Sequence, residues 1–364
     1  MCSLISFTIL IINTHWLIYA IYLFTSLIFL QLIFITCITL RKKIFEKNKK
    51  SWTEIISEQI SQAIFYEEND TVLINVKSIS AKLLRKRAFR QLFIDEIIQT
   101  KKSFTGTASF NLKKLYTIFK LGKDSGKKLK SRKWQIKSKG IQELALMEET
   151  TYVKKFFRLS NNKNEMVRNE AQCGLVSLYG FLGLRFLNVT TRPVSEWQQI
   201  QLLNKLNGIT PANFSPMQKW LLSPNESVVE FSIKLAAFYN NYAAYASVIK
   251  CLQQPQTTIK LAVLEYLKKM AEEDACNDII AAYMPADKTC KLAILATLKE
   301  IGNEKQIPFL LLQLHHEDDD IKAAAAKSIS LLHPGGSAFL QTQLYADQHP
   351  WKTIYLQINN EKAA

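Results

Sequence analysis

The segments IKLAVLEYL (residues 259–267), CKLAILATL (290–298) and IKAAAAKSI (321–329) share one pattern and start 31 residues apart. In each, an apolar residue is followed by lysine, and small or apolar residues return four and eight positions later, which is the spacing of one helix face. The same pattern starts at Ile136 and Val167, also 31 residues apart. A fixed period of this length indicates an array in which each unit is a pair of helices.

The phase continues through the middle of the chain, where the residues are more divergent. Starts are expected near residues 198 and 229, and the sequence supplies Gln198 with Leu202 and Leu206, then Val228–Val229 with Ser232 and Ala236, a slip of one residue. The last start, near Lys352, is degenerate, as a terminal capping repeat should be. We therefore predict a solenoid over residues 131–364.

These residues resemble the HEAT-repeat (armadillo-like) family, in which a Val-Arg pair begins the second helix of each unit. Val167-Arg168 matches that pair literally, and Ile259-Lys260 and Ile321-Lys322 match it conservatively. The resemblance implies a right-handed α-solenoid of antiparallel helix pairs, with aspartate or asparagine in the turn. It also implies a scaffold or adaptor that binds partners along its surface.

Composition favours helices over the whole chain. Gly and Pro are sparse, 11 and 9 of 364 residues, so the turns of an all-β fold are lacking. The net charge of +16 lies entirely between Arg41 and Gly140, where 25 Lys/Arg stand against 9 Asp/Glu; residues 141–364 hold 22 of each sign. We expect an all-α protein with a basic region ahead of a neutral solenoid.

One segment predicts a transmembrane helix. Leu17 to Leu40 contains 24 residues without a charge, and a helix of that length spans about 36 Å, enough for a bilayer core. Trp16, Tyr19 and Tyr22 fit an outer aromatic belt, and Arg41, Lys42 and Lys43 follow the segment. The positive-inside rule places the N-terminus outside and the rest in the cytoplasm.

This topology predicts a single-pass protein of the cell (inner) membrane. A cleaved signal peptide is the alternative, but it would need a basic start, a shorter apolar core and small residues at the cleavage site. Residues 1–12 are either interfacial or part of the span. We expect three parts: residues 1–40 with the span at 17–40, a basic helical region at 41–130, and the solenoid at 131–364.

The basic region should begin with a short amphipathic helix. Ser51 to Glu54 form a capping-box pattern, after which Trp52, Ile56, Ile60 and Ile64 recur every fourth residue. That apolar face either lies on the bilayer or, as we favour, packs on the next helix. Residues 122–128 contain two glycines but not the spacing of a phosphate-binding loop, and we expect a flexible basic linker there.

A second helix, from about Val76 to Thr100, carries the basic residues that are our candidates for contact with anionic lipid or an acidic partner. Anionic lipid attracts basic residues next to a membrane without a further partner. An acidic protein surface is nearly as well supported, whereas nucleic acid is disfavoured because no binding motif is present. The candidates are Lys82, Arg85, Lys86, Arg87 and Arg90.

No pattern predicts catalysis, a cofactor or a metal. Nucleophile, zinc and nucleotide motifs are lacking, and the six cysteines form no CxxC pair, which suits free thiols in a reducing compartment. The cluster from His315 to Asp320 could suggest a metal site, but acidic residues in a turn more often cap the next helix.

Aromatic residues are frequent in the first half of the solenoid. Most should lie between helices, and any that are exposed on one face are candidates for docking a protein, because Tyr and Trp dominate interface energetics. The candidates are Trp197, Trp220, Tyr239, Tyr242 and Tyr245.

These observations favour a non-enzymatic, membrane-tethered adaptor whose cytoplasmic solenoid binds a protein. The layout resembles membrane-anchored bacterial HEAT-repeat proteins, which implies an envelope polysaccharide glycosyltransferase complex as the partner. A regulatory or sensory membrane component is the alternative, and an enzyme such as a hydrolase is third.

Overall fold

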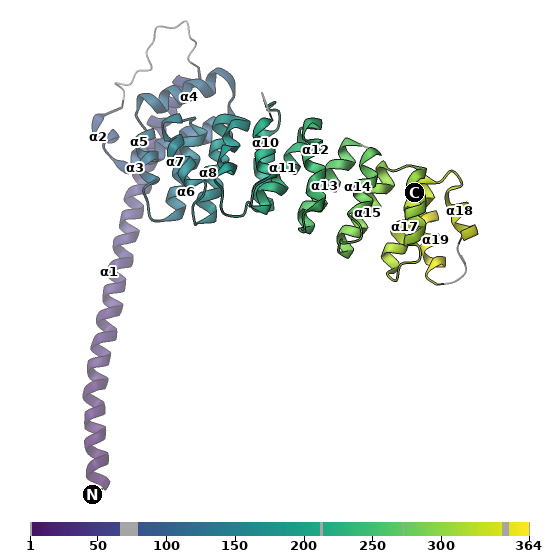
Figure 1. Cartoon of the computed structure of the whole chain (residues 1–364). Coiled ribbons are helices and arrows are strands. Elements are labelled where there is room, and N and C mark those ends of the chain that lie inside the picture. Colours follow the sequence, from purple (N-terminus) through teal and green to yellow (C-terminus); the bar gives the residue numbers. More distant parts are fainter. Residues whose placement is uncertain (1, 66–78, 212–213, 272, 344–348, 364) are drawn as a thin grey trace. The chain divides into compact units, whose positions relative to one another are not determined.

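The computed structural model in Figure 1 describes residues 2–65, 79–211, 214–271, 273–343 and 349–363. Over these residues all regular structure is helical, without strands, so the prediction of an all-α protein is confirmed. The chain divides into two compact units, Met1–Lys128 and Leu129–Ala364, which we call the N-terminal and the C-terminal unit.

The N-terminal unit is built on one very long helix. Its elements are α1 (Cys2–Ile64), α2 (Ala81–Leu84), α3 (Arg87–Ser103), α4 (Gly106–Ile118) and α5 (Gly122–Lys128). α1 is continuous through Ser51, so the separate amphipathic helix predicted there is wrong. Residues 41–51 contain neither Gly nor Pro, and without a helix breaker the capping box has no end to cap.

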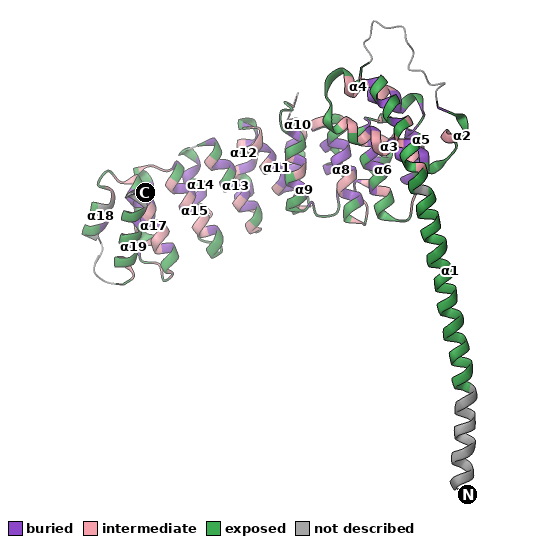
Figure 2. Cartoon of the chain, turned by 180° about the vertical axis from the view of Figure 1, so that it is seen from behind, coloured by how far each residue is buried: buried purple, intermediate pink, exposed green. Residues whose placement is uncertain are grey.

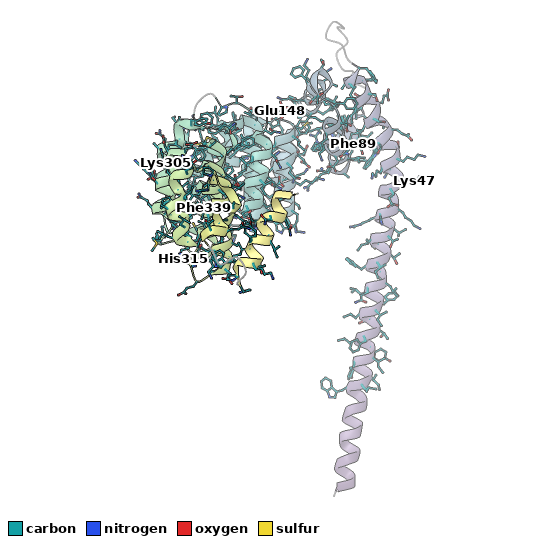
Figure 3. All side chains as sticks on the ribbon, turned by 90° about the vertical axis from the view of Figure 1, so that its right-hand side faces the viewer. Lys47, Phe89, Glu148, Lys305, His315 and Phe339 are labelled. Carbon is teal, nitrogen blue, oxygen red and sulfur yellow. The ribbon has the colours of Figure 1, made fainter. Side chains whose placement is uncertain are left out.

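The C-terminal part of α1 packs against α3 and α4, as we favoured from the sequence. Trp52, Ile56 and Ile60 are buried, and the ring of Trp52 meets that of Phe89 edge to face with 5.8 Å between centroids. Phe89 lies among the packed helices, whereas Lys47 lies on the open part of α1 (Figure 3). These contacts, rather than the bilayer, cover the face that recurs every fourth residue.

The single helix predicted from Val76 to Thr100 is wrong over its described part, which starts at residue 79. Lys86 adopts an extended conformation, with φ −77° and ψ 118°, and separates α2 from α3. Ser80 caps α2, where its hydroxyl oxygen accepts from the Lys82 backbone N–H at 3.3 Å. The break was missed because none of the residues that separate α2 from α3 is Gly or Pro.

Residues 122–128 also differ from expectation, because they form helix α5 instead of a flexible linker. The hydroxyl of Tyr116 donates to the Ser125 hydroxyl at 2.9 Å and ties α5 to α4. The turn between them closes with Leu121 N–H on the Tyr116 carbonyl (3.1 Å) and Lys120 N–H on the Thr117 carbonyl (2.9 Å), a Schellman arrangement. This turn fixes where α5 begins.

The C-terminal unit is an array of helix pairs (Figure 1). The second helices of successive pairs form one row of neighbours: α6 (Trp134–Leu146), α8 (Glu165–Tyr179), α9 (Glu196–Leu206), α11 (Glu226–Phe238), α13 (Thr257–Met270), α15 (Lys288–Ile301) and α17 (Asp319–Leu332). Their starts are 31 residues apart, except for 30 between α9 and α11. The predicted phase and its one-residue slip are therefore present in the structure.

The first helices of the pairs are shorter and lie against this row. They are α7 (Val153–Leu159), α10 (Ser215–Leu221), α12 (Tyr245–Ile249), α14 (Cys276–Ala281), α16 (Ile307–Gln313) and α18 (Gly336–Gln343), with α19 (Trp351–Ala363) at the end. Short 3-10 segments complete the pairs: η2 (Thr150–Tyr152), η3 (Gly180–Asn188), η4 (Tyr242–Ala244), η5 (Lys250–Gln253), η6 (Glu273–Ala275) and η7 (Glu304–Gln306).

The pattern residues of the repeat form the core of the array. Ile259, Val263 and Leu267 are fully buried, as are their equivalents Ile294 and Leu298 one repeat later. Ile136 is the exception at 40% exposure. The buried face of α6 is formed by Ile141 and Leu144, so the first predicted start lies outside the core.

Polar side chains join each repeat to the next. The hydroxyl of Thr257 donates to Asp287 at 2.5 Å, and Lys288 pairs with Asp318 at 2.6 Å. Asn225 donates from its amide to the Arg192 carbonyl at 3.0 Å. These partners are about one repeat apart in the chain. The polar contacts therefore link the turns of neighbouring repeats, while the apolar faces of the same repeats stack.

Candidate functional site

A cavity in the N-terminal unit is lined mainly by charged side chains. A pocket of about 560 Å³ opens where the α2–α3 break faces the turn between α4 and α5. We call it the basic pocket. Its lining residues are Leu84, Arg85, Arg87, Arg90, Gln91, Lys120, Lys123, Asp124, Lys127 and Lys128.

Arg90 holds the two parts of the basic pocket's lining together. Its Nε donates to Asp124 Oδ2 at 2.5 Å, its Nη1 to the Phe119 carbonyl at 3.1 Å, and its Nη2 to the Lys120 carbonyl at 3.0 Å. These carbonyls are available because α4 ends there, and Lys120 takes a left-handed conformation with φ 53°. The guanidinium thus joins α3 to the α4–α5 turn.

Charge in the basic pocket is strongly one-sided. Seven of its lining residues are Arg or Lys, and Asp124 is the one acid among them. That acid is already engaged by Arg90 and, at 3.2 Å, by Lys127. Arg85, Arg87, Lys120 and Lys123 are exposed. The described lining has a formal excess of six positive charges, whose mutual repulsion a bound anion would reduce.

The five basic candidates from the sequence separate into two groups. Arg85, Arg87 and Arg90 line the basic pocket, whereas Lys82 and Lys86 are exposed outside it. Lys86 instead places its Nζ 5.5 Å from the centre of the Trp52 ring, a cation–π contact. The four lysines of the α4–α5 segment complete the pocket and were missed, because we expected a linker there.

One of the aromatic docking candidates belongs to the core, and a second packs against it. Trp220 is 1% exposed, and its Nε1 donates to the Asn188 side chain at 2.9 Å. Tyr239 is half-buried and lies 5.9 Å from Phe181, ring centre to ring centre, and burial raises the pKa of its hydroxyl. Trp220 therefore presents no surface to a partner, which corrects its selection. Met217, Trp220 and Leu221 fall on one face of α10 at helical spacing, and all three are buried, so the sequence held a signal that Trp220 belongs to the core.

The other three aromatic candidates retain some surface. Trp197 is 66% and Tyr242 57% exposed, and Tyr245 is half-buried against the core. The Tyr242 hydroxyl reaches the Met270 carbonyl at 3.4 Å, so one end of that side chain is held. Trp197 is the most exposed aromatic side chain among the candidates.

Exposed apolar side chains accompany Trp197 on the same row of helices. Ile200 lies one turn further along α9, and Met166 occupies the matching position at the start of the neighbouring α8; they are 49% and 48% exposed. The equivalent position in α11 is Ser227. The first repeats thus offer an apolar surface that the later ones replace with polar residues. Met166 and Ile200 were not selected from the sequence.

The cluster from His315 to Asp320 acts as a helix cap. Asp318 accepts through Oδ1 from the backbone N–H of Asp320 at 2.9 Å and of Ile321 at 3.4 Å. Lys288 pairs with both Asp318 and Asp320, and its hydrogen bond lowers the pKa of Asp318. The capping interpretation of this segment is confirmed.

The apolar segment of α1 is fully open in this structure. The large apolar side chains that it carries between Trp16 and Leu40 are 46–72% exposed, and Figure 2 shows this part of the helix as exposed. By length and composition it is the one helix in the described part of the chain that could cross a membrane, with a mean hydropathy of 2.3. Helices that form a soluble core and signal sequences can have the same composition.

The fold and these sites together define an all-helical repeat protein with a basic pocket and an apolar N-terminal helix. No protein-family model matches the chain, and no curated protein matches it. Among solved structures, human deoxyhypusine hydroxylase in complex with glycerol is 14% identical, with a TM-score of 0.30, over 67% of this chain and 96% of that chain. A likeness this low carries no argument about function.

Proposed function

We propose that this protein is a single-pass membrane adaptor. In this proposal the segment from Leu17 to Leu40 crosses the inner membrane with its N-terminus outside, and the remaining residues lie in the cytoplasm. The C-terminal unit is a right-handed HEAT-like solenoid that binds a protein and does not itself catalyse a reaction. An envelope polysaccharide glycosyltransferase complex is the partner we propose.

The observation that carries the proposal is the exposure of the apolar segment of α1. A run of 24 uncharged residues whose large apolar side chains all face solvent would be strongly unfavourable in water. A bilayer removes that cost, and Arg41, Lys42 and Lys43 would then lie at the cytoplasmic surface.

The continuity of α1 argues against removal of this segment as a signal peptide. The helix passes from the apolar segment to Trp52 and Ile56, which are buried in the N-terminal unit. Cleavage after Leu40 would therefore cut an uninterrupted helix. A retained anchor keeps the helix whole.

Two surfaces support the partner assignments. Trp197, Ile200 and Met166 offer an exposed apolar surface on neighbouring helices, the kind that anchors protein interfaces. Lys82 in α2 and Lys86 just after it are exposed in the N-terminal unit, and close to a bilayer surface anionic lipid would attract each basic residue by about 1 kcal/mol.

Photo-crosslinking in cells tests the adaptor role. A photoreactive amino acid at Trp197 should capture one reproducible protein, and the same label at Leu331, 59% exposed on α17, should not. Trp197→Ala in a protein labelled at Ile200 should weaken capture of that protein. Failure of the Trp197 label to capture any reproducible protein, in the full chain or in a version lacking residues 1–50, would overturn the proposal.

Topology and catalysis have separate tests. Protease added to intact spheroplasts should leave the solenoid undigested, and its digestion would show that the orientation is wrong. Hydrolase activity of the purified protein that is lost on mutation of its own residues would contradict the non-enzymatic role.

A further inference from the structure

The basic pocket has the features of a binding site instead of a merely charged surface. It is concave, and its volume of about 560 Å³ lies in the range of small-molecule sites, roughly 300–1,000 Å³. Its cationic residues come from two parts of the chain, residues 85–90 and 120–128. A long unbroken run of lysines would give charge without this geometry.

The pocket is also held in place by the fold. Arg90 makes an ion pair with Asp124 and bonds to two carbonyls, so the two halves of the lining cannot separate without losing all three interactions. Asp124 neutralises little of the charge, because Arg90 and Lys127 already share it. Arg85, Arg87, Lys120 and Lys123 therefore surround a preformed cavity with their charges in excess.

The lining indicates what kind of ligand fits. Leu84 is the one apolar side chain among the described lining residues, which excludes a largely apolar ligand. Arginine and lysine together are typical of phosphate sites, where the guanidinium binds two oxygens and the ammonium acts as a point charge. A group with two or more negative charges matches the excess better than a single carboxylate.

A second cavity in the same protein shows that this composition is specific. The pocket beside Thr190 and Asn225 in the C-terminal unit has a similar volume, about 610 Å³. Its charged lining residues are Glu226 and Glu230, without Lys or Arg. A third pocket, beside Lys49 and Lys50, balances these lysines with Glu46 and Glu54, so a strong excess of positive charge is not a general property of the described cavities.

We propose that the basic pocket binds a phosphate-bearing ligand with two or more negative charges. The phosphate belongs either to a soluble phosphorylated molecule or to the headgroup of an anionic lipid. Arg85, Arg87, Lys120 and Lys123 contact the phosphate oxygens, while Arg90 positions the lining. The site deepens the lipid contact proposed above, but it does not depend on the solenoid having a protein partner.

Paired variants separate a built site from general attraction. Arg87→Gln with Lys123→Gln removes two charges from the pocket, and Lys102→Gln with Lys133→Gln removes two exposed charges outside both the pocket and the proposed lipid contact. The full-length protein in nanodiscs of neutral lipid is titrated with pyrophosphate by calorimetry, at about 150 mM salt to screen diffuse attraction. In parallel, nanodiscs containing phosphatidic acid replace the neutral ones.

The pocket pair should weaken binding about tenfold or more, and the outer pair less than about twofold. Loss of pyrophosphate binding would identify a soluble ligand, and loss confined to phosphatidic acid would identify a lipid headgroup. If both pairs of variants lost equal binding affinity, the proposal of a built pocket would be overturned. The diffuse lipid contact under Proposed function would remain. If the protein bound neither pyrophosphate nor phosphatidic acid, the proposed pocket would be overturned as well.

A measurement on the unmutated protein guards against misfolded variants. Acetylation of lysines in the presence of the bound probe should slow at Lys123 and Lys127 and remain unchanged at Lys102 and Lys133. Unchanged acetylation at all four residues while the probe is bound would place the ligand elsewhere and contradict the proposal.

Discussion

At the scale of single residues, Gly183 has the tightest surroundings of the glycines in the array. A Cβ atom there would stand 2.3 Å from the Leu175 carbonyl oxygen, a backbone atom that cannot move without α8. We expect Gly183→Ala to destabilise the C-terminal unit by about 1–3 kcal/mol, measured as the urea midpoint of the full-length protein.

Gly208 provides the control for this prediction. It has φ +74°, but no other atom lies within 4 Å of the point that a Cβ would occupy, so Gly208→Ala should cost only the backbone strain, about 1 kcal/mol. If Gly183→Ala were the milder of the two, the close approach of η3 to α8 would be contradicted.

Buried thiols give a second prediction at this scale. Cys173, Cys251, Cys276 and Cys290 are free and buried, and burial raises the pKa of each thiol. The reactive thiolate is therefore scarcer at neutral pH than for an ordinary cysteine. Maleimide should label these four slowly in the native protein and fully in denaturant, as followed by mass spectrometry. Rapid native labelling of any of them would show that its repeat opens.

At the scale of elements, the start of α17 depends on a charged cap. Lys288 lowers the pKa of Asp318 below 3.8, and Asp318 raises that of Lys288 above 10.5. A carboxylate with a lowered pKa stabilises the fold above its unfolded value and loses that contribution as the pH falls through the folded pKa. The matching contribution of Lys288 is lost only as the pH rises above 10.5.

The variant Asp318→Asn should distinguish the contribution of helix capping to stability from the contribution of the carboxylate charge. Asparagine still caps a helix, so the variant loses the pairing with Lys288 and should be less stable than the unmutated protein at about pH 7. The difference should shrink as the pH falls below 3.8 and disappear only below the lowered folded pKa, where the aspartate is neutral in the folded protein as well. Denaturant midpoints from about pH 2 to 7 measure it. A difference that stayed constant over this range would show that the charge is irrelevant.

The sequence predicted some elements well for a local reason. The second helices of the repeat follow one periodic pattern, so Val263 and Leu267 could be assigned to a buried face without knowing their neighbours. The break at Lys86 could not be predicted, because neither Arg85 nor Lys86, the residues between α2 and α3, is a helix breaker. Trp220 and Trp197 were selected together, although the spacing of Met217, Trp220 and Leu221 places Trp220 on an apolar helix face.

The basic pocket could be predicted only in part. Arg85, Arg87 and Arg90 stood out by their density, but the pocket needs Lys120 and Lys123 as well. Arg90 and Asp124 are separated by 34 residues in the chain. The α4–α5 turn brings them together, and from the sequence alone we expected a flexible linker after it. Charge density thus located half of the lining, and tertiary packing supplied the rest.

At the scale of the whole molecule, the charge is arranged in three zones that match the proposed membrane placement. Uncharged residues end at Leu40, the excess of positive charge follows as far as Gly140, and the later residues are balanced. The repeats after Gly140 carry no net charge and are therefore not drawn to the membrane surface by their own field. The basic zone would therefore meet lipid or phosphate, while the repeats remain available to a protein.

The anchor assignment can be tested by placing charge inside the apolar segment. Its fifteen Leu, Ile and Phe residues favour insertion by roughly 5–9 kcal/mol in total, whereas each central arginine opposes it by about 3 kcal/mol. Ile28→Arg with Leu32→Arg should therefore bring insertion close to balance, and carbonate should extract much of the protein from membranes. Ile44→Arg with Ser51→Arg adds the same charge beyond the segment and should leave it resistant. Equal extraction of both variants, or resistance of both, would mean that residues 17–40 do not hold the protein in the bilayer.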